Sequence, residues 1–170
     1  LNPTPIPASA MPDTLADAEL NAVLEVGLAS GEVMNRLATT ISTQGGAILA
    51  IDYGYARTQT GETLQGVRRH QYADVLDAPG EVDISAHVDF EALGTVATKA
   101  GLAVQPLATQ GQFLTRMGIN ERTSALIAAN PGSAQDLSAA KARLVGPDQM
   151  GNLFKVFCAA SPGLQPPGFE

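Results

Sequence analysis

Two polar side chains, Asp52 and Tyr53, come directly after the apolar run from Ala47 to Ile51. A short apolar run of this kind is typical of a strand that is covered on both faces, as in a parallel sheet. Open α/β sheets bind ligands beside the carboxyl ends of such strands, where a carboxylate could orient a bound group through paired hydrogen bonds. Both residues are therefore candidate catalytic residues. In the structural alternative, Asp52 bonds the following turn and Tyr53 packs with its hydroxyl in water.

A second set of polar residues alternates along 82–88, where Asp83, Ser85 and His87 share one face of a predicted strand. Alternate residues of a strand lie ~6.6 Å apart, too far for a chain of direct hydrogen bonds between short side chains. This spacing argues against a hydrolytic triad and against a metal site. The following Asp89 is explained as a helix cap. Asp83 and His87 have no such local role, so they either bind a substrate in a polar channel or face solvent.

Gln110 is a further candidate for substrate contact. Its neighbours Thr109 and Gln112 have the spacing of a capping box, which accounts for both of them. Gln110 has no part in that motif, so it can offer a polar contact near the ligand-binding edge of the sheet.

The apolar pattern predicts strands alternating with helices, which indicates an α/β fold. Strands are predicted at 20–26, 47–51, 82–88, 102–107 and 153–158, with a short one near 63–67 inside an irregular region at 54–80. Helices are predicted at 30–43, 90–100 and 109–118, and Asn120 and Ser133 can cap two more. The helices around 109–145 form an addition to the sheet.

Proline residues crowd both ends of the chain. Pro3, Pro5, Pro7 and Pro12 predict that residues 1–18 are an extended linker arriving from an upstream segment. Residues 19–160 are predicted to form the folded domain, and 161–170 a loose tail.

Composition limits the classes of partner. The net charge of −7 disfavours nucleic acid and anionic membrane surfaces, and no apolar run approaches the ~20 residues that span a bilayer. The single cysteine, Cys158, excludes an internal disulfide and favours a reducing compartment such as the cytosol. It lies beside Phe157 in an apolar run, so we expect a buried small hydrophobe rather than a nucleophile.

Five blocks, in this order and rough spacing, resemble the carboxyl-terminal half of the MidA family of class I S-adenosylmethionine-dependent methyltransferases. They are Gly45 to Gly54, Thr63 to Gln65, Asp83 to Phe90, Thr109 to Leu114 with Gly118-Ile119, and Met150 to Val156. The family is related to the mitochondrial complex I assembly factor that symmetrically dimethylates an arginine.

The resemblance implies the later strands of a Rossmann-like methyltransferase sheet flanked by helices. It also implies an enzyme that uses S-adenosylmethionine to dimethylate arginine in a protein substrate, with a respiratory complex I type of subunit as one such partner, in the bacterial cytoplasm. The glycine-rich donor loop would lie in an amino-terminal half upstream. This chain would then carry the acceptor side and be inactive alone.

Two other interpretations stay open. The segment from Val23 to Gly31 imitates the donor loop of class I methyltransferases, with Glu25, Gly27 and Gly31 as cofactor-binding residues. Ala29 occupies the middle glycine position, where a methyl group obstructs close approach of a ligand. On this interpretation the chain is a compact complete methyltransferase. Alternatively, it is a noncatalytic interaction module that uses the linker and the helical addition as contact surfaces.

Overall fold

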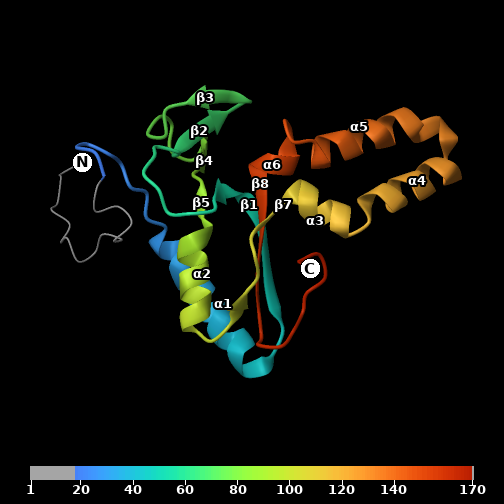
Figure 1. Cartoon of the computed structure of the whole chain (residues 1–170). Coiled ribbons are helices and arrows are strands. Elements are labelled where there is room, and N and C mark those ends of the chain that lie inside the picture. Colours follow the sequence, from blue (N-terminus) through green and yellow to red (C-terminus); the bar gives the residue numbers. More distant parts are fainter. Residues whose placement is uncertain (1–17, 170) are drawn as a thin grey trace.

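The computed structural model describes residues 18–169, which are built around a five-stranded mixed sheet (Figure 1). Its strands are β1 (Ala47–Tyr55), β5 (Val88–Asp89), β6 (Ala103–Val104), β7 (Ala108–Thr109) and β8 (Phe154–Ala160). The order is β5-β1-β8-β6, and β7 also pairs with β8. β1 runs antiparallel to β8 over residues 47–53. It runs parallel to β5 at Gly54 and Tyr55 only.

Helices α1 (Leu28–Gln44) and α2 (Phe90–Lys99) pack on one face of this sheet (Figure 1). The core between the two layers takes its largest side chains from α2 and β8; its buried members are Met34, Ala38, Phe90, Leu93, Ala97, Leu102, Phe157 and Ala159. The predicted α/β fold is thus confirmed. Asp89 caps α2 as predicted, because its side chain accepts a hydrogen bond from the Ala92 N–H.

The other face and the outer edge of β1 are uncovered in this part of the chain. Ile48 and Ala50 pack against the core, so alternation turns Leu49 and Ile51 to the opposite face, where they are 52% and 45% exposed. Away from β8, residues 47–53 pair with no strand among residues 18–169. The prediction of a short parallel strand covered on both faces is therefore wrong. β1 also continues past Asp52 to Tyr55, because β5 pairs with its end.

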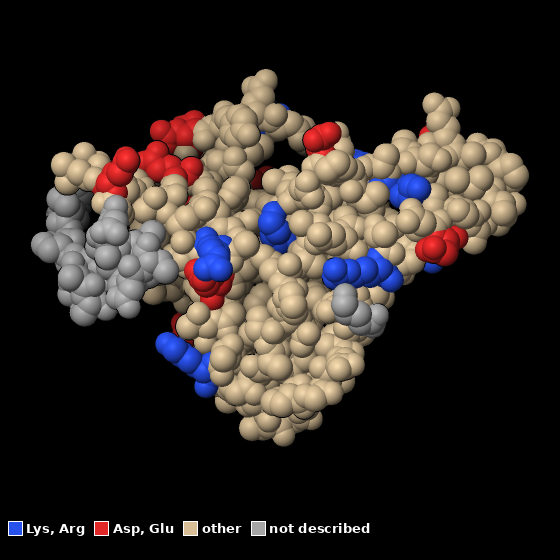
Figure 2. Space-filling model, in the orientation of Figure 1, with Lys and Arg blue, Asp and Glu red and all other residues tan. Residues whose placement is uncertain are grey.

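A second, three-stranded antiparallel sheet lies beyond the end of β1, in the order β3-β2-β4 (Figure 1). It comprises β2 (Gln65–Arg68), β3 (Gln71–Ala73) and β4 (Asp83–Ser85). The single strand predicted at 82–88 is wrong, because the chain changes sheets after Ser85 and continues as β5. Ile84, on the apolar side of the alternation at 82–88, is 58% exposed. Asp and Glu side chains gather over this end of the molecule in Figure 2.

The helical addition is confirmed as an arm that projects from the sheet (Figure 1). It consists of α3 (Gln110–Arg116), α4 (Ile119–Ala129), the 3-10 turn η3 (Pro131–Ser133), α5 (Ala134–Val145) and α6 (Met150–Leu153). Both hydrogen bonds of the predicted capping box at Thr109 and Gln112 are present. Asn120 lies inside α4 rather than at its start. Ser133 is the N-cap residue of α5 as predicted, but it makes no side-chain capping bond, and its hydroxyl accepts a hydrogen bond from Asn130.

The two ends of the described chain differ from the sequence-based expectations. Residues 20–26 do not form the predicted strand; their one backbone bond to another segment joins the Val23 carbonyl to the Gly61 N–H, at 2.9 Å. The tail that was predicted to be loose packs against the domain as far as Phe169, because the Phe169 ring centroid lies 5.4 Å from that of Phe113. In addition, Arg116 donates a hydrogen bond of 3.2 Å to the Gly168 carbonyl. The linker predicted at 1–18 falls almost wholly outside the described residues.

Candidate functional site

A cavity of about 730 Å³ lies where β1 ends and just before β5 begins. Gly54 and Tyr55 of β1 and His87, just before β5, form one wall. The 59–63 loop and residues 147–155, between α5 and β8, form the others. The cavity thus brings together three segments that are far apart in the sequence, at the sheet edge where α/β proteins bind ligands.

His87 is held among aromatic rings in this wall. Its ring centroid lies 5.6 Å from that of Tyr53 and 5.2 Å from that of Tyr55, both in edge-to-face geometry. Tyr53 also contacts Phe154 edge-to-face at 5.6 Å. Such contacts favour a single ring orientation. Two polar atoms here, Tyr55 Oη and His87 Nδ1, are buried without a hydrogen-bond partner among the described residues.

Glu25 fastens the loop opposite this wall. Its carboxylate accepts hydrogen bonds from the Thr63 N–H at 2.7 Å, from the Leu64 N–H at 2.8 Å and from the Thr63 hydroxyl. The Thr63 hydroxyl oxygen in turn accepts from the His87 N–H at 2.9 Å. A chain of contacts therefore runs from Glu25 through Thr63 to the backbone that presents His87.

These contacts predict an acid-sensitive contribution to stability. Burial raises the pKa of Glu25, but the hydrogen bonds from Thr63 and Leu64 and the nearby His87 outweigh it, so the pKa lies below its ordinary 4.5. A lowered folded-state pKa stabilises the fold above pH 4.5, and that contribution is lost as the pH falls through the lowered value. We expect Glu25→Gln to lose about 1 kcal/mol in urea unfolding at pH 7. The deficit should vanish at acid pH. Glu19→Gln is the control, and an equal deficit at all pH values would contradict the prediction.

The charges around the cavity are mostly acidic. The exposed carboxylates of Glu62 and Asp148 lie on its lining, against a single lysine, Lys155. The Lys155 ammonium donates to the carbonyls of Asn152 at 2.6 Å and of Leu153 at 3.2 Å. Its burial lowers its pKa. The two carboxylates outnumber the one ammonium, so the lining favours a cationic ligand over an anionic one.

Residues 1–108 match a family model described as "Putative S-adenosyl-L-methionine-dependent methyltransferase". The chain belongs to this family. A Danio rerio protein named "Protein arginine methyltransferase NDUFAF7, mitochondrial" is 38% identical over 135 residues, 79% of this chain and 32% of its own. The Homo sapiens protein of that name is 34% identical over 159 residues, 92% of this chain and 35% of its own. The chain therefore spans about a third of the length of these relatives, and the predicted resemblance to MidA methyltransferases is confirmed.

Solved structures of similar fold come from Burkholderia thailandensis. One, an uncharacterized protein, aligns with a TM-score of 0.75 over 98% of this chain and 45% of its own, at 24% identity. Another is described as a "likely methyl transferase" and is bound to S-adenosyl-homocysteine. It aligns with a TM-score of 0.64 over 80% of this chain and 36% of its own, at 26% identity. The fold of this chain is thus a methyltransferase-family fold.

The five catalytic and substrate-binding candidates predicted from the sequence do not lie together in the structure. Of the five, His87 alone lines the cavity, and Tyr53 supports it from behind. Asp52 lies opposite Lys155 across β1 and β8 without an ion pair, and its carboxylate accepts from the Tyr53 N–H. Asp83 is exposed on β4. Gln110 is buried and donates to the Leu144 carbonyl at 2.8 Å, which ties α3 to the end of α5.

The residues suggested for a donor loop do not fit that role. No strand precedes α1 within the described residues, so the strand-turn-helix geometry of such a loop is missing. Both Glu25 oxygens are engaged by Thr63 and Leu64, which leaves them poorly placed to bind ribose hydroxyls. Gly27 precedes α1 and Gly31 lies in its first turns. Within the described residues this segment therefore lacks the geometry of a donor loop.

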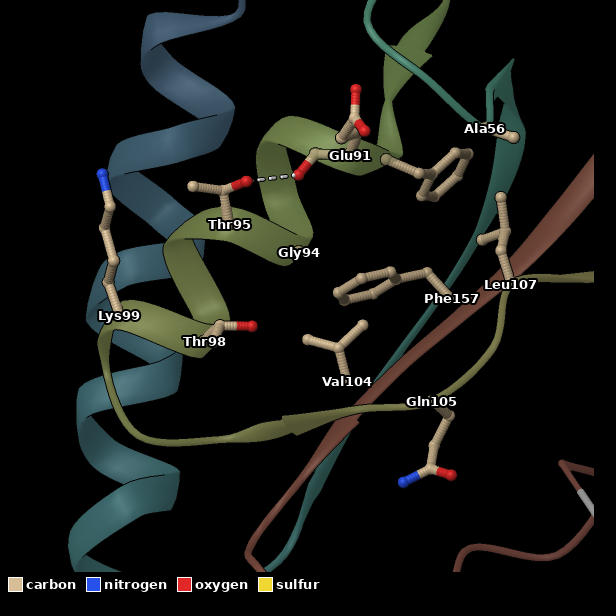
Figure 3. A pocket seen from close by; sticks show the side chains of 11 residues that line it. Ala56, Glu91, Gly94, Thr95, Thr98, Lys99, Val104, Gln105, Leu107 and Phe157 are labelled. Carbon is tan, nitrogen blue, oxygen red and sulfur yellow. Dashed lines mark hydrogen bonds between the residues drawn. The ribbon is translucent and has the colours of Figure 1, made fainter.

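A second cavity, of about 540 Å³, lies between α2 and the strands β6 and β8 (Figure 3). The Phe157 and Val104 side chains point into it, and Gly94 lies opposite them on α2. The Thr95 hydroxyl on its rim already donates to the Glu91 carbonyl at 3.0 Å. Its lining holds no unpartnered buried polar atom, unlike the cavity beside β1 and β5. The latter is therefore the stronger candidate site.

Proposed function

We propose that the chain is the acceptor-side part of an S-adenosylmethionine-dependent methyltransferase that dimethylates arginine in a protein substrate. The observation that carries the proposal is the acidic cavity at the end of β1 and the start of β5, in a member of a methyltransferase family. The names of the relatives support arginine in a protein as the acceptor.

The uncovered edge of β1 supports the division into two halves. α1 leads into β1 through Gly45 and Gly46 alone, and a helix in this position normally connects two neighbouring parallel strands in a right-handed crossover. The first strand of that unit would precede α1 and pair along 47–53. Residues 18–27 instead bond to the 61–64 loop. An upstream segment that supplied the strand would also cover the exposed Leu49 and Ile51.

Methyl transfer needs alignment of an acceptor nitrogen with the sulfonium methyl group more than it needs acid-base chemistry, and bound S-adenosylmethionine supplies that methyl group. Holding two reactants in line accounts for a large part of such catalysis. In this proposal the residues of this chain bind and orient the acceptor, and they exclude water from one side of it. The carboxylates of Glu62 and Asp148 attract a cationic side chain to the cavity mouth.

The partner and the compartment are part of the same proposal. A protein of the respiratory complex I type is one acceptor that fits it. The single cysteine, which is buried, supports a reducing compartment such as the bacterial cytoplasm, while the relatives are named as mitochondrial proteins. Within residues 18–169 no helix is long and apolar enough to cross a membrane.

Calorimetry tests the division into halves. S-adenosylmethionine titrated into the 170-residue chain should give no stoichiometric binding, because the described residues form no donor loop. The same titration into the chain joined to the amino-terminal part of the Burkholderia thailandensis relative should give one site. A one-to-one complex with the chain alone would contradict the half-enzyme proposal and favour the compact complete enzyme.

Transfer of tritium from labelled S-adenosylmethionine by the joined protein to a bacterial protein extract tests the activity. We expect the label in dimethylarginine after acid hydrolysis of the extract. Label confined to lysine or to nucleic acid would contradict the acceptor assignment. Binding of the donor without any transfer would contradict the catalytic proposal.

A noncatalytic interaction module is the second candidate. The observation in its favour is an apolar groove of about 320 Å³ between α4 and α5, whose lining includes Leu126, Leu137 and Leu144. Leu126 and Leu144 are 41% and 37% exposed on an arm that projects from the sheet (Figure 1). This candidate would be favoured if Leu126→Ser abolished binding of a protein partner and if no form of the protein transferred a methyl group.

A further inference from the structure

Two residues that line the candidate cavity each carry an unsatisfied polar atom. Tyr55 Oη and His87 Nδ1 are both buried and have no hydrogen-bond partner among the described residues, and their rings are 5.2 Å apart. Buried polar groups are nearly always hydrogen-bonded, and one left unpaired destabilises the fold by about 1–3 kcal/mol. Because both residues line the cavity, a ligand bound there can satisfy these two atoms once the groups that cover them shift.

The chemistry of these atoms defines what they can bind. A neutral imidazole accepts a hydrogen bond at Nδ1 when its proton is on Nε2, and a phenol oxygen can accept as well as donate. Both atoms can therefore accept from a ligand that carries several N–H groups. The carboxylates of Glu62 and Asp148 add negative charge at the cavity, while the Lys155 ammonium is turned to two carbonyls. These features together favour a cation with N–H donors fixed in one plane.

We propose that Tyr55 and His87 form the subsite that receives the guanidinium group of the acceptor. The inference rests on the proposed function, and it assigns the residues that bind the acceptor, which that function does not name. The guanidinium donates to Tyr55 Oη and to His87 Nδ1, and it stays fully protonated in this contact. Because urea derivatives have a similar shape but no charge, the acidic lining makes the subsite selective for the cation.

The two rings are held in place before a ligand arrives, and only the groups that cover their polar atoms must shift to admit it. The Gly54–Val88 and Tyr55–Asp89 pairs fix the two backbones that carry the rings, and Tyr53 packs edge-on against His87 from the other side. The Thr63 hydroxyl holds the His87 N–H, and Glu25 holds Thr63. Pre-formed geometry of this kind reduces the entropy lost on binding. Glu25 is thereby a positioning residue for His87.

The two histidines of the chain provide an internal control for the test. In nitrogen NMR spectra of the chain with labelled histidine, methylguanidinium is titrated as the probe. We expect the His87 Nδ1 resonance to shift, while the resonances of His70, which is exposed in the turn between β2 and β3, stay in place. Methylurea, of the same shape without charge, should shift neither.

A matched pair of variants tests the contribution of the phenol. Tyr55→Phe removes one hydrogen bond to a charged group and should weaken methylguanidinium binding about tenfold. Tyr72→Phe, at a position that is 84% exposed on β3, should leave it unchanged. Equal shifts at both histidines, equal binding of methylurea, or undiminished binding by Tyr55→Phe would overturn the inference.

The outcomes separate this inference from the proposed function. If the joined protein methylates arginine and Tyr55→Phe keeps the parent affinity and KM, the function stands and the subsite is refuted. If no methyl transfer occurs while methylguanidinium still shifts His87 alone, the subsite stands as a cation site and the function is refuted.

Discussion

Phe157→Ala should lower the free energy of unfolding by about 3–5 kcal/mol, the range for removing a buried aromatic ring. Phe157 is 1% exposed at the centre of β8, and its ring stacks on that of Phe90 with centroids 6.1 Å apart. The ring also fills the space over Gly94 of α2. Its loss would therefore enlarge the cavity that already lies between the sheet and α2. Urea unfolding followed by circular dichroism measures the change.

Leu49→Ala is the matched control for that variant. Leu49 pairs with Cys158, next to Phe157 on β8, but it lies on the uncovered face and is 52% exposed. We expect its loss to be below about 1 kcal/mol, since most of the side chain is already in water. Similar losses for the two variants would contradict the exposure of this face of β1.

Features that depend on short-range interactions were predictable from the sequence. The Asp89 cap of α2 and the capping box at Thr109 and Gln112 rest on contacts within three residues, and both are present. The last strand, β8, was predictable because its residues are buried on both faces and form an unbroken apolar run. In these cases the local pattern and the tertiary structure demand the same residues.

Features that depend on distant pairing were not predictable in the same way. The alternation at 82–88 is that of one strand, yet β4 pairs with β2 and β5 pairs with β1, so the same pattern serves two sheets. The segment 20–26 is apolar enough for a strand, but a strand needs a partner, and here its Glu25 side chain bonds to Thr63 and Leu64 instead. A single sequence carries no direct record of these partners.

The site was partly predictable for the same reason. His87 stood out because no local role explained it, and it lies on the cavity wall. Tyr55 was missed, although it follows Tyr53 at the two-residue period of a strand, because β1 was expected to end at Ile51. Thr63 and Lys155 come from other segments, and topology alone brings them to the same cavity.

The Gly54→Ala variant should lose about 2–4 kcal/mol of stability and disturb the candidate site as well. A Cβ atom at this position would lie 2.0 Å from the Val88 carbonyl oxygen and 2.8 Å from the Val88 nitrogen. These are backbone atoms of the paired strand, so the strands must separate rather than a side chain rotate. Overpacking of this kind usually costs about 1–3 kcal/mol, and here it also weakens the only two pairs that join β1 to β5. Thermal unfolding measures the loss.

Gly31→Ala supplies the contrasting variant, since a Cβ there meets no atom within 4 Å. In the first turns of α1 it should raise stability by up to about 1 kcal/mol, because alanine favours a helix more than glycine does. Gly54→Ala should also shift the His87 resonances without any ligand, whereas Gly31→Ala should not. A Gly54→Ala protein with parent stability would contradict the close approach of β1 and β5. If the variant is destabilised but keeps the parent His87 resonances, the pairing of β1 with β5 does not determine the position of His87. The glycine of the Asp-Tyr-Gly segment thus has a physical role of its own, since it lets β5 approach closely enough to place His87 beside Tyr55.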